Sequence, residues 1–214
     1  MTAWEHATDA VTLLKNKENL LPLIVKENET ILFVFTSATR PYTAEMAMEC
    51  LTEKGLMPKS VTYQCIAVSE DTEQETIEAA KDADYVIAVS SVFNTGGFNP
   101  AADNCVTSRI FDAVIEAAHD SGHKAVFLSG VLPYDAARYQ AADAIVLSYD
   151  SYGMKKVPTG VTAYIPNLIA GMCCIFGEFE PVGTLPVVIP ALDEDYTFTE
   201  TILFDRGFSL SCAG

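Results

Sequence analysis

Short apolar runs alternate with stretches of helical periodicity along most of this chain. The run Ile-Leu-Phe-Val-Phe at 31–35 is continuously apolar and ends in Thr36, as expected of a strand buried on both faces of a sheet. Further strands are expected at 61–68, 85–89, 125–128 and 144–147, and helices at 43–54, 72–81, 106–121, 134–142 and 165–176. Residues 3–14 are predicted to form an entering helix, and the proline-bounded segment 185–190 an edge strand.

One αβ unit occurs twice, since residues 80–90 and 140–148 share an Ala- and Asp-rich helix end followed by an apolar strand. Strands that alternate with helices of this length pair in parallel through right-handed crossovers. We therefore expect an α/β fold: a three-layer αβα sandwich with a mostly parallel sheet of five or six strands and helices on both faces.

The chain has 214 residues, half of them hydrophobic, which suits a single sizeable core. Its formal charge of -16 would repel phosphate backbones and anionic lipids, so we expect no nucleic-acid and no membrane partner. No window approaches the roughly 20 apolar residues that span a bilayer, and residues 2–9 lack the order of a signal peptide. We expect a soluble chain, and its localisation stays unknown.

The cysteines and histidines do not form a metal-binding motif in sequence. No C-x-x-C pair occurs, and Cys173 and Cys174 lie in an apolar segment, where thiols pack as small hydrophobes. His119 and His123 are separated by Gly122, which should end a helix, so His119 is expected to face the helix C-terminal dipole. We expect no disulfide framework, no metal and no cofactor. The six cysteines are Cys50, Cys65, Cys105, Cys173, Cys174 and Cys212.

Ligands of an open parallel sheet bind beyond the carboxyl ends of its strands, where the strand order reverses. The longest predicted loop there is 90–105, whose amides, flexible backbone and one aromatic ring could contact a sugar; a solvated connector is the alternative. Asp103 is the only carboxylate in this loop and a weak catalytic candidate, since it could equally cap the helix that follows. The candidate binding residues are Asn94, Thr95, Gly96, Phe98 and Asn99.

A second candidate segment follows the strand at 144–147. Tyr149, Asp150 and Tyr152 offer two rings and a carboxylate for substrate binding, although a surface turn would use the same residues. The segment Arg-Pro-Tyr at 40–42 has the same two interpretations.

Three other patterns are more easily explained by structure. Asp135 is expected in the first turn of a helix, where an acid stabilises unpaired N–H groups. The pair Gly96-Gly97 lacks the motifs of phosphate-binding loops. Ser129 lacks the glycine two residues earlier that a nucleophile elbow needs, which disfavours a serine hydrolase.

Motifs near both ends carry a family resemblance. Leu-Leu-Lys-Asn at 13–16 before Leu-Leu-Pro-Leu at 20–23, and Phe-Gly-Glu at 176–178 before Gly-Thr-Leu-Pro at 183–186, resemble the C-terminal domain of family 3 glycoside hydrolases. Pro-Tyr-Asp-Ala-Ala at 133–137 and the segment 166–171 are similar to the two-domain β-N-acetylglucosaminidase (β-N-acetylhexosaminidase) branch. The closing segment 204–210 departs from the family pattern, with Asp205 and Arg206 in place of a Pro-rich turn.

This resemblance implies a preceding (β/α)8 barrel that carries the catalytic nucleophile. Residues 1–22 would then be an entering helix and linker from that missing barrel, and 23–214 a single C-terminal domain. The parent would hydrolyse O-glycosyl bonds of a carbohydrate substrate, while this chain supports and partly lines the site and is inactive alone. Apolar surface meant for the barrel could make the isolated domain a homodimer.

Retaining glycosidases need a carboxylate nucleophile and a group that protonates the leaving oxygen. In β-glucosidase-like members of the family, that acid is a Glu in the loop after the strand that here ends at Ser90. This chain has no Glu between Ser91 and Glu116. In the N-acetylglucosaminidase branch the acid/base is a His in the barrel, so the resemblance transfers no catalytic residue. The alternatives are a β-glucosidase-like C-terminal domain, a stand-alone carbohydrate-binding or interaction module, and an unrelated flavodoxin-like sensor that binds a flavin or nucleotide.

Overall fold

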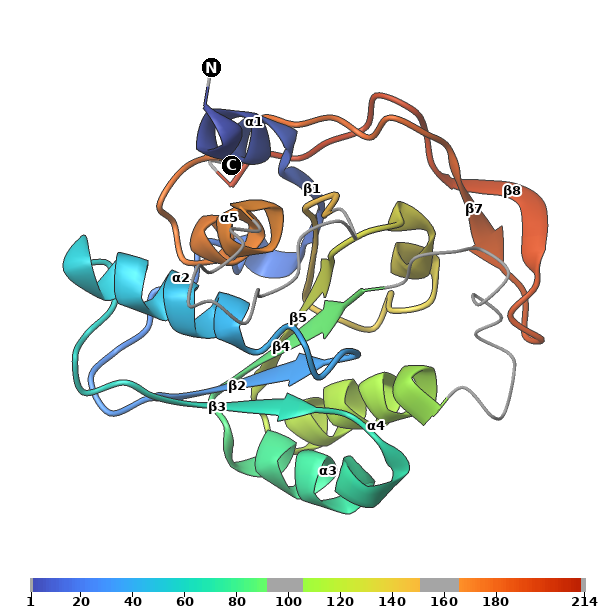
Figure 1. The fold of residues 1–214 in the computed structure, drawn as a ribbon. Helices are drawn as coiled ribbons and strands as arrows, with labels where there is room; N and C mark the ends of the chain where they lie inside the picture. The colour runs from blue at the N-terminus through green and yellow to red at the C-terminus, as the bar shows by residue number, and fades with distance from the viewer. Residues whose placement is uncertain (1, 92–105, 151–165, 213–214) are drawn as a thin grey trace.

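The computed structural model describes residues 2–91, 106–150 and 166–212. Six strands form the main sheet in the order β1-β6-β5-β4-β2-β3, with α1, α2 and α5 on one face and α3 and α4 on the other (Figure 1). The helices are α1 (Ala3–Ala10), α2 (Tyr42–Glu53), α3 (Glu73–Asp82), α4 (Val106–Asp120) and α5 (Pro166–Ile175), with short 3-10 helices η1 (Lys17–Asn19), η2 (Glu70–Thr72) and η3 (Pro133–Ala137). The strands of the main sheet are β1 (Thr12–Asn16), β2 (Thr30–Phe35), β3 (Thr62–Ala67), β4 (Tyr85–Ser90), β5 (Lys124–Ser129) and β6 (Ala144–Leu147).

Alternate residues of the central strands enter two separate hydrophobic cores. In β2, Phe33 and Phe35 face the core under α2 and α5, while Leu32 and Val34 face the core over α3 and α4. All four side chains are fully buried. The continuously apolar run at 31–35 is therefore a strand covered on both faces, as the sequence predicted.

The sheet is parallel except at one edge. β2, β3, β4, β5 and β6 pair in parallel, and β1 pairs antiparallel with β6. The chain runs from β2 to β3 on one side and then crosses to β4 on the other side of β2, so the strand order reverses between β2 and β4. The predicted three-layer sandwich with a mostly parallel sheet is confirmed.

The predicted helix over 3–14 is wrong beyond Ala10. Thr2 begins α1 with a capping box, since its hydroxyl accepts the Glu5 N–H at 3.2 Å and its own N–H donates to the Glu5 carboxylate. Leu13 and Leu14 then face opposite cores, and this alternation is that of a strand buried on both faces. Leu13 and Leu14 would fit a helical period equally well. They form a strand because the backbone of β1 pairs with the otherwise unpaired edge of β6.

The helix predicted over 134–142 is also wrong, because only η3 forms there. Its residues Ala136 and Ala137, and the following Tyr139 and Ala142, are buried against the core over α3 and α4. The apolar spacing that suggested a helix reflects a tight turn in which these four side chains face inward.

The C-terminal segment forms a small sheet of its own. β7 (Ile189–Leu192) pairs antiparallel with β8 (Phe198–Phe204), apart from the main sheet (Figure 1). The edge strand predicted at 185–190 is wrong in its bounds, since β7 begins at Ile189 and runs past Pro190. It lies at an edge, but of the small sheet, because the edges of the main sheet are β1 and β3. Among the described residues, every helix is too short or too polar to cross a bilayer.

Candidate functional site

Three serines form a row at the carboxyl edge of the parallel strands. Ser90 ends β4 and is in register with Ser129 at the end of β5, and the Ser148 N–H donates to the Ser129 carbonyl at 3.0 Å. Ser90, Ser129 and Ser148 are all buried. These residues close the carboxyl edge with short polar side chains, and the predicted loops begin just beyond them.

The reversal of strand order places two loop starts side by side. The Ser91 N–H donates to the Thr36 hydroxyl at 2.9 Å, which joins the residue after β4 to the residue after β2. The Thr36 N–H in turn donates to the Val89 carbonyl at 3.2 Å. A ligand site is expected at such a switch point.

A buried ion pair crosses this edge. Arg40, in the turn before α2, lies 3.2 Å from the Asp150 carboxylate, and both side chains are almost fully buried. The Asp150 N–H also donates to the Gly130 carbonyl, which fixes the chain after β6 against the end of β5. Two candidate segments from the sequence, 40–42 and the one containing Asp150, are thus brought together, and Arg40 neutralises the only carboxylate that either contributes to the described structure.

A second buried carboxylate, Asp135, lies beneath the row of serines. Its Oδ1 is 2.5 Å from the Ser129 hydroxyl, which is also 3.0 Å from the Leu132 carbonyl. Burial raises the pKa of Asp135 to about 6, and the hydrogen bond from the Ser129 hydroxyl acts against this rise. Because the Ser129 hydroxyl has one proton, a protonated Asp135 can donate to Ser129 while Ser129 donates to Leu132.

The predicted position of Asp135 in the first turn of a helix is confirmed for η3, but the hydrogen bond of its carboxylate is with the Ser129 hydroxyl. Burial beneath the sheet edge was not foreseen. Because its side chain is fully buried, Asp135 is part of the packed structure beneath the loops and is not accessible to a substrate.

Tyr149 and Asn167 complete the described part of this edge. Tyr149 has a positive φ of 52°, and its hydroxyl donates to the Thr12 hydroxyl of β1 at 3.3 Å. Asn167, at the start of α5, donates from Nδ2 to the Ser148 carbonyl at 3.0 Å. Tyr149 therefore contacts the antiparallel edge of the sheet.

Several predicted site residues lie outside the described residues. They are Asn94, Thr95, Gly96, Phe98, Asn99, Asp103 and Tyr152.

The histidine that sequence analysis assigned to a helix end lies at the opposite edge of the sheet. His119 Nε2, in the last turn of α4, is 2.9 Å from the Asp143 carboxylate just before β6. Asp143 is buried and also accepts the Ala125 N–H at 3.0 Å. The helix-end location of His119 is as predicted, but its contact is with a carboxylate that joins α4, β5 and β6.

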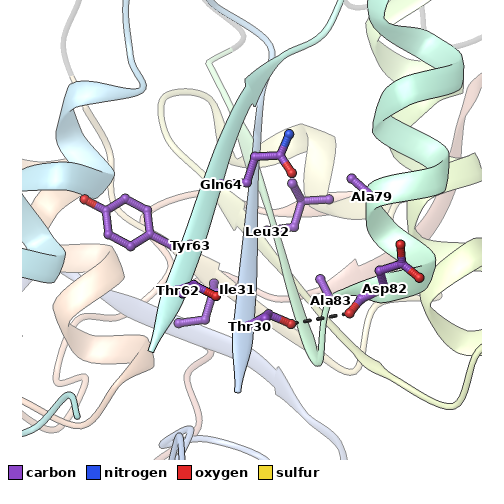
Figure 2. Close-up of a pocket in the computed structure, with 9 residues that line it drawn as sticks. All are labelled: Thr30, Ile31, Leu32, Thr62, Tyr63, Gln64, Ala79, Asp82 and Ala83. Atoms are coloured by element: carbon purple, nitrogen blue, oxygen red, sulfur yellow. Dashed lines mark hydrogen bonds between the residues drawn. The ribbon is translucent and has the colours of Figure 1, made fainter. Parts of the chain in front are cut away.

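A shallow pocket of about 240 Å³ also lies away from the carboxyl edge, at the start of β2 and β3 (Figure 2). Thr30 and Thr62 begin these two strands, and the Thr30 hydroxyl donates to the Asp82 carbonyl at 3.4 Å. Ligand pockets usually reach roughly 300–1,000 Å³. Its size and its place at the amino ends make this pocket a weaker candidate than the carboxyl edge.

Within the described ranges, the residues that directly follow β2, β4, β5 and β6 include no His and no pair of solvent-facing carboxylates. The exposed Glu70 and Asp71 follow β3, at the outer edge of the sheet. Asp150 is paired and Asp135 is buried, so neither is placed for acid–base chemistry on a sugar. What the described edge provides is a rigid base for the loops that follow Ser91 and Asp150. The sequence located these strand ends but did not predict the ion pair between Arg40 and Asp150. The only signal for that ion pair in the sequence is a single Arg soon after an apolar run.

Three solved structures that share this fold are glycosidases. A fungal multi-domain GH3 β-N-acetylglucosaminidase with a GCN5-related glucosamine N-acetyltransferase region is 20% identical with a TM-score of 0.61, over 90% of this chain and 19% of that chain. A β-glucosidase from Erythrobacter marinus is 16% identical with a TM-score of 0.64, over 98% and 34%. A β-glucosidase from Listeria innocua in complex with isofagomine is 14% identical with a TM-score of 0.59, over 98% and 33%.

At these identities the likeness establishes the fold. This chain spans between 19% and 34% of the length of the three structures. No protein with a curated description matches the sequence.

The family itself is established by a match along nearly the whole sequence. The model of the glycosyl hydrolase family 3 C-terminal domain matches residues 11–212, from the residue before β1 to the end of the described chain. The match agrees with the sandwich and with the motifs near both ends of the sequence. This chain therefore belongs to the family of glycosyl hydrolase family 3 C-terminal domains.

Proposed function

We propose that this chain is the C-terminal domain of a glycosidase that acts on β-linked N-acetylhexosaminides, with the catalytic residues in a preceding (β/α)8 barrel. The family match over residues 11–212 is the observation that carries the proposal. The domain's own part is to support the active site and to line it with loops from the carboxyl edge. β1 belongs to the main sheet, so within the predicted linker 1–22 only the residues before β1, which include α1, would connect the domain to the barrel.

The choice of the N-acetylhexosaminidase branch rests on the loop after β4. This loop has no Glu between Ser91 and Glu116, so it lacks the acid expected of a β-glucosidase-like member. Asp103 is the only carboxylate between these two residues, apart from Asp112 within α4. The fungal β-N-acetylglucosaminidase among the similar structures is consistent with this choice.

The described carboxyl edge suits a supporting role. Ser91 is held by Thr36, and Asp150 is held by Arg40 and Gly130, so segments 92–105 and 151–165 both begin from buried, bonded residues. Anchored loop bases reduce the conformational entropy lost when a loop contacts substrate. We propose that Asn94, Thr95, Gly96, Phe98, Asn99 and Tyr152 contribute the sugar contacts.

Two assays test this proposal. The chain alone, given 4-nitrophenyl β-N-acetylglucosaminide, should show no turnover above buffer, because the nucleophile lies elsewhere. Robust turnover that is abolished by Asp103→Asn would overturn the division of roles between the two domains.

The substrate class is tested in the longer protein, if the reading frame upstream of Met1 encodes a barrel. Its kcat/KM for the β-N-acetylglucosaminide should exceed that for the β-glucoside by at least about tenfold, a difference of about 1.4 kcal/mol in transition-state binding. The reverse preference would assign the domain to a β-glucosidase. A frame without a barrel would instead favour a stand-alone binding module.

A further inference from the structure

Three groups that can bind a metal meet where α2 packs on α5, far from the carboxyl edge. They are the thiols of Cys50 in α2 and Cys173 in α5, and the carboxylate of Glu178 just after α5. Their ligand atoms all lie within 4.8 Å of one another, and Cys50 Sγ is 3.7 Å from Glu178 Oε2. In the sequence, Cys50 is remote from the other two, so no spacing motif could have shown this cluster.

The turn after α5 positions Glu178. Gly177 has a φ of 82°, and the N–H groups of Gly177 and Glu178 donate to the Cys174 and Cys173 carbonyls, both at 3.0 Å. This arrangement is the left-handed helix end that glycine favours. It turns the chain back so that the Glu178 side chain lies beside the Cys173 thiol.

The geometry is close to that of a tetrahedral zinc site. Zn–S bonds of about 2.3 Å and Zn–O bonds of about 2.1 Å place neighbouring ligand atoms roughly 3.5–3.8 Å apart. The observed separations, at most 4.8 Å, need a contraction of about 1 Å or less. Rotation of the Cys50 and Glu178 side chains, neither of which is fully buried, can supply that movement.

The charges at the site are compatible with a bound divalent cation. Lys54, one turn after Cys50, pairs with Glu178, and its side chain is 46% exposed while that of Glu178 is 9% exposed. Two thiolates and one carboxylate would be balanced by Lys54 and a divalent cation. Burial raises the pKa of the Cys50 and Cys173 thiols, and Glu178 raises both further; a bound cation reverses this, since coordinating thiols are deprotonated.

We propose that Cys50, Cys173 and Glu178 bind one zinc ion, with water as the fourth ligand. On binding, each thiol releases its proton to solvent, and two Zn–S bonds and one Zn–O bond form as the hydrated ion gives up all but one of its waters. The site joins the end of α5 to α2 and so stabilises the face on which α1, α2 and α5 lie. It does not depend on the proposed glycosidase function, and it departs from the expectation that all the cysteines are simply packed thiols.

The direct test is equilibrium dialysis of the reduced, chelator-stripped chain against Zn²⁺ at pH 7.5, with the bound metal counted by mass spectrometry. One zinc per chain is expected. Cys50→Ser and Glu178→Ala should each weaken binding by at least about 100-fold, because a lost ligand costs more than a lost outer partner. Cys65→Ser is the matched control, since Cys65 is a half-buried thiol on β3, and it should bind as the wild type does.

Cobalt substitution and thermal unfolding separate a lost site from a lost fold. Co²⁺ should give the wild type a thiolate-to-metal charge-transfer band that Cys50→Ser lacks. Zn²⁺ should raise the Tm of the wild type and not that of Cys50→Ser, whose Tm without metal should stay close to that of the stripped wild type. Zinc binding by Cys50→Ser at wild-type affinity overturns the proposal, and so does a wild type that binds no zinc and instead forms a Cys50–Cys173 disulfide under mild peroxide.

Discussion

The guanidinium of Arg40 lies 3.2 Å from the carboxylate of Asp150, in an ion pair whose side chains are only 6% and 1% exposed. Arg40 follows β2 and Asp150 follows β6, so one contact joins strand ends separated by β4 and β5. Both residues stand at the carboxyl edge, where loops of the domain begin. The pair therefore sets the relative position of two loop bases, and its loss should affect stability and loop placement together.

Arg40→Met should destabilise the chain by about 3–5 kcal/mol, because it leaves the Asp150 carboxylate buried without its cation. Urea unfolding at pH 7 measures this loss. The double variant Arg40→Met, Asp150→Leu should recover most of it, since no buried charge remains.

Arg109→Met is the comparison at the surface. Arg109 pairs with Glu73 across α4 and α3, but its side chain is 52% exposed, so its loss should cost under about 1 kcal/mol. Equal costs for the two single variants would mean that burial of the Arg40 pair contributes little.

Asp135 should make the stability of the chain fall as pH rises from about 4 to 6. In this range the unfolded carboxyl is ionised, whereas burial keeps the folded one protonated until its pKa of about 6, so unfolding releases a proton. Asp135→Asn removes this dependence. Relative to the variant, the wild type should lose about 2 kcal/mol of stability between pH 4 and pH 6, and little more above pH 7.

Urea unfolding of the wild type and Asp135→Asn at several pH values measures the difference. Ser129→Ala should move the transition to higher pH, because the Ser129 hydroxyl stabilises the ionised carboxylate. Parallel pH profiles for the wild type and Asp135→Asn would show that Asp135 is ionised in the fold like an exposed acid.

Asp143 should have the opposite effect on how stability depends on pH. Burial opposes its ionisation, but the Ala125 N–H and His119 outweigh that effect and hold the pKa of Asp143 below its usual value. Asp143 therefore contributes its full stabilisation of the fold above about pH 4, the pKa of an Asp in the unfolded chain. This contribution is lost as the pH falls through the lower pKa of Asp143 in the folded chain.

Asp143→Asn should cost about 2–3 kcal/mol at pH 7, the scale of buried hydrogen bonds to a charged group. The difference from the wild type should shrink below about pH 4, which guanidinium unfolding at pH 7 and pH 3 can follow. His119→Ala should cost less, about 1 kcal/mol, because the His119 side chain is 34% exposed. A cost for Asp143→Asn that stays constant with pH would contradict this assignment.

Gly130 should tolerate no side chain. A Cβ there would lie 2.4 Å from the Ser90 carbonyl oxygen and 2.9 Å from Leu168 Cδ2, so β4 and β5 would have to separate. Gly130→Ala should cost at least about 2–3 kcal/mol in urea unfolding. Gly55→Ala is the control, because a Cβ at Gly55 would have no atom within 4 Å. Only the positive φ of 72° disfavours a side chain there, so a cost of about 1 kcal/mol is expected. Similar costs for the two variants would show that β4 and β5 can move apart to accommodate the Cβ.

The pattern of apolar and polar residues along the chain predicted most of the helices and strands around the site. The strand at 144–147 has the predicted bounds, and the helix predicted at 43–54 is α2, one residue earlier. These segments are long or continuously apolar, so neighbouring residues determine their conformation. The errors at 3–14 and 134–142 arose where one apolar spacing fits two conformations and the partner surface chooses between them.

The alternation of buried strands with amphipathic helices, which is a property of adjacent residues, was enough by itself to determine the sandwich. Tertiary structure alone decided that Leu13 and Leu14 complete a strand at the edge of β6, that Arg40 meets Asp150, and that Cys50 meets Cys173 and Glu178. Each of these relationships joins residues remote in sequence. Their separation depends on strand order and on which helix packs against which, and periodicity along the chain carries no information about either.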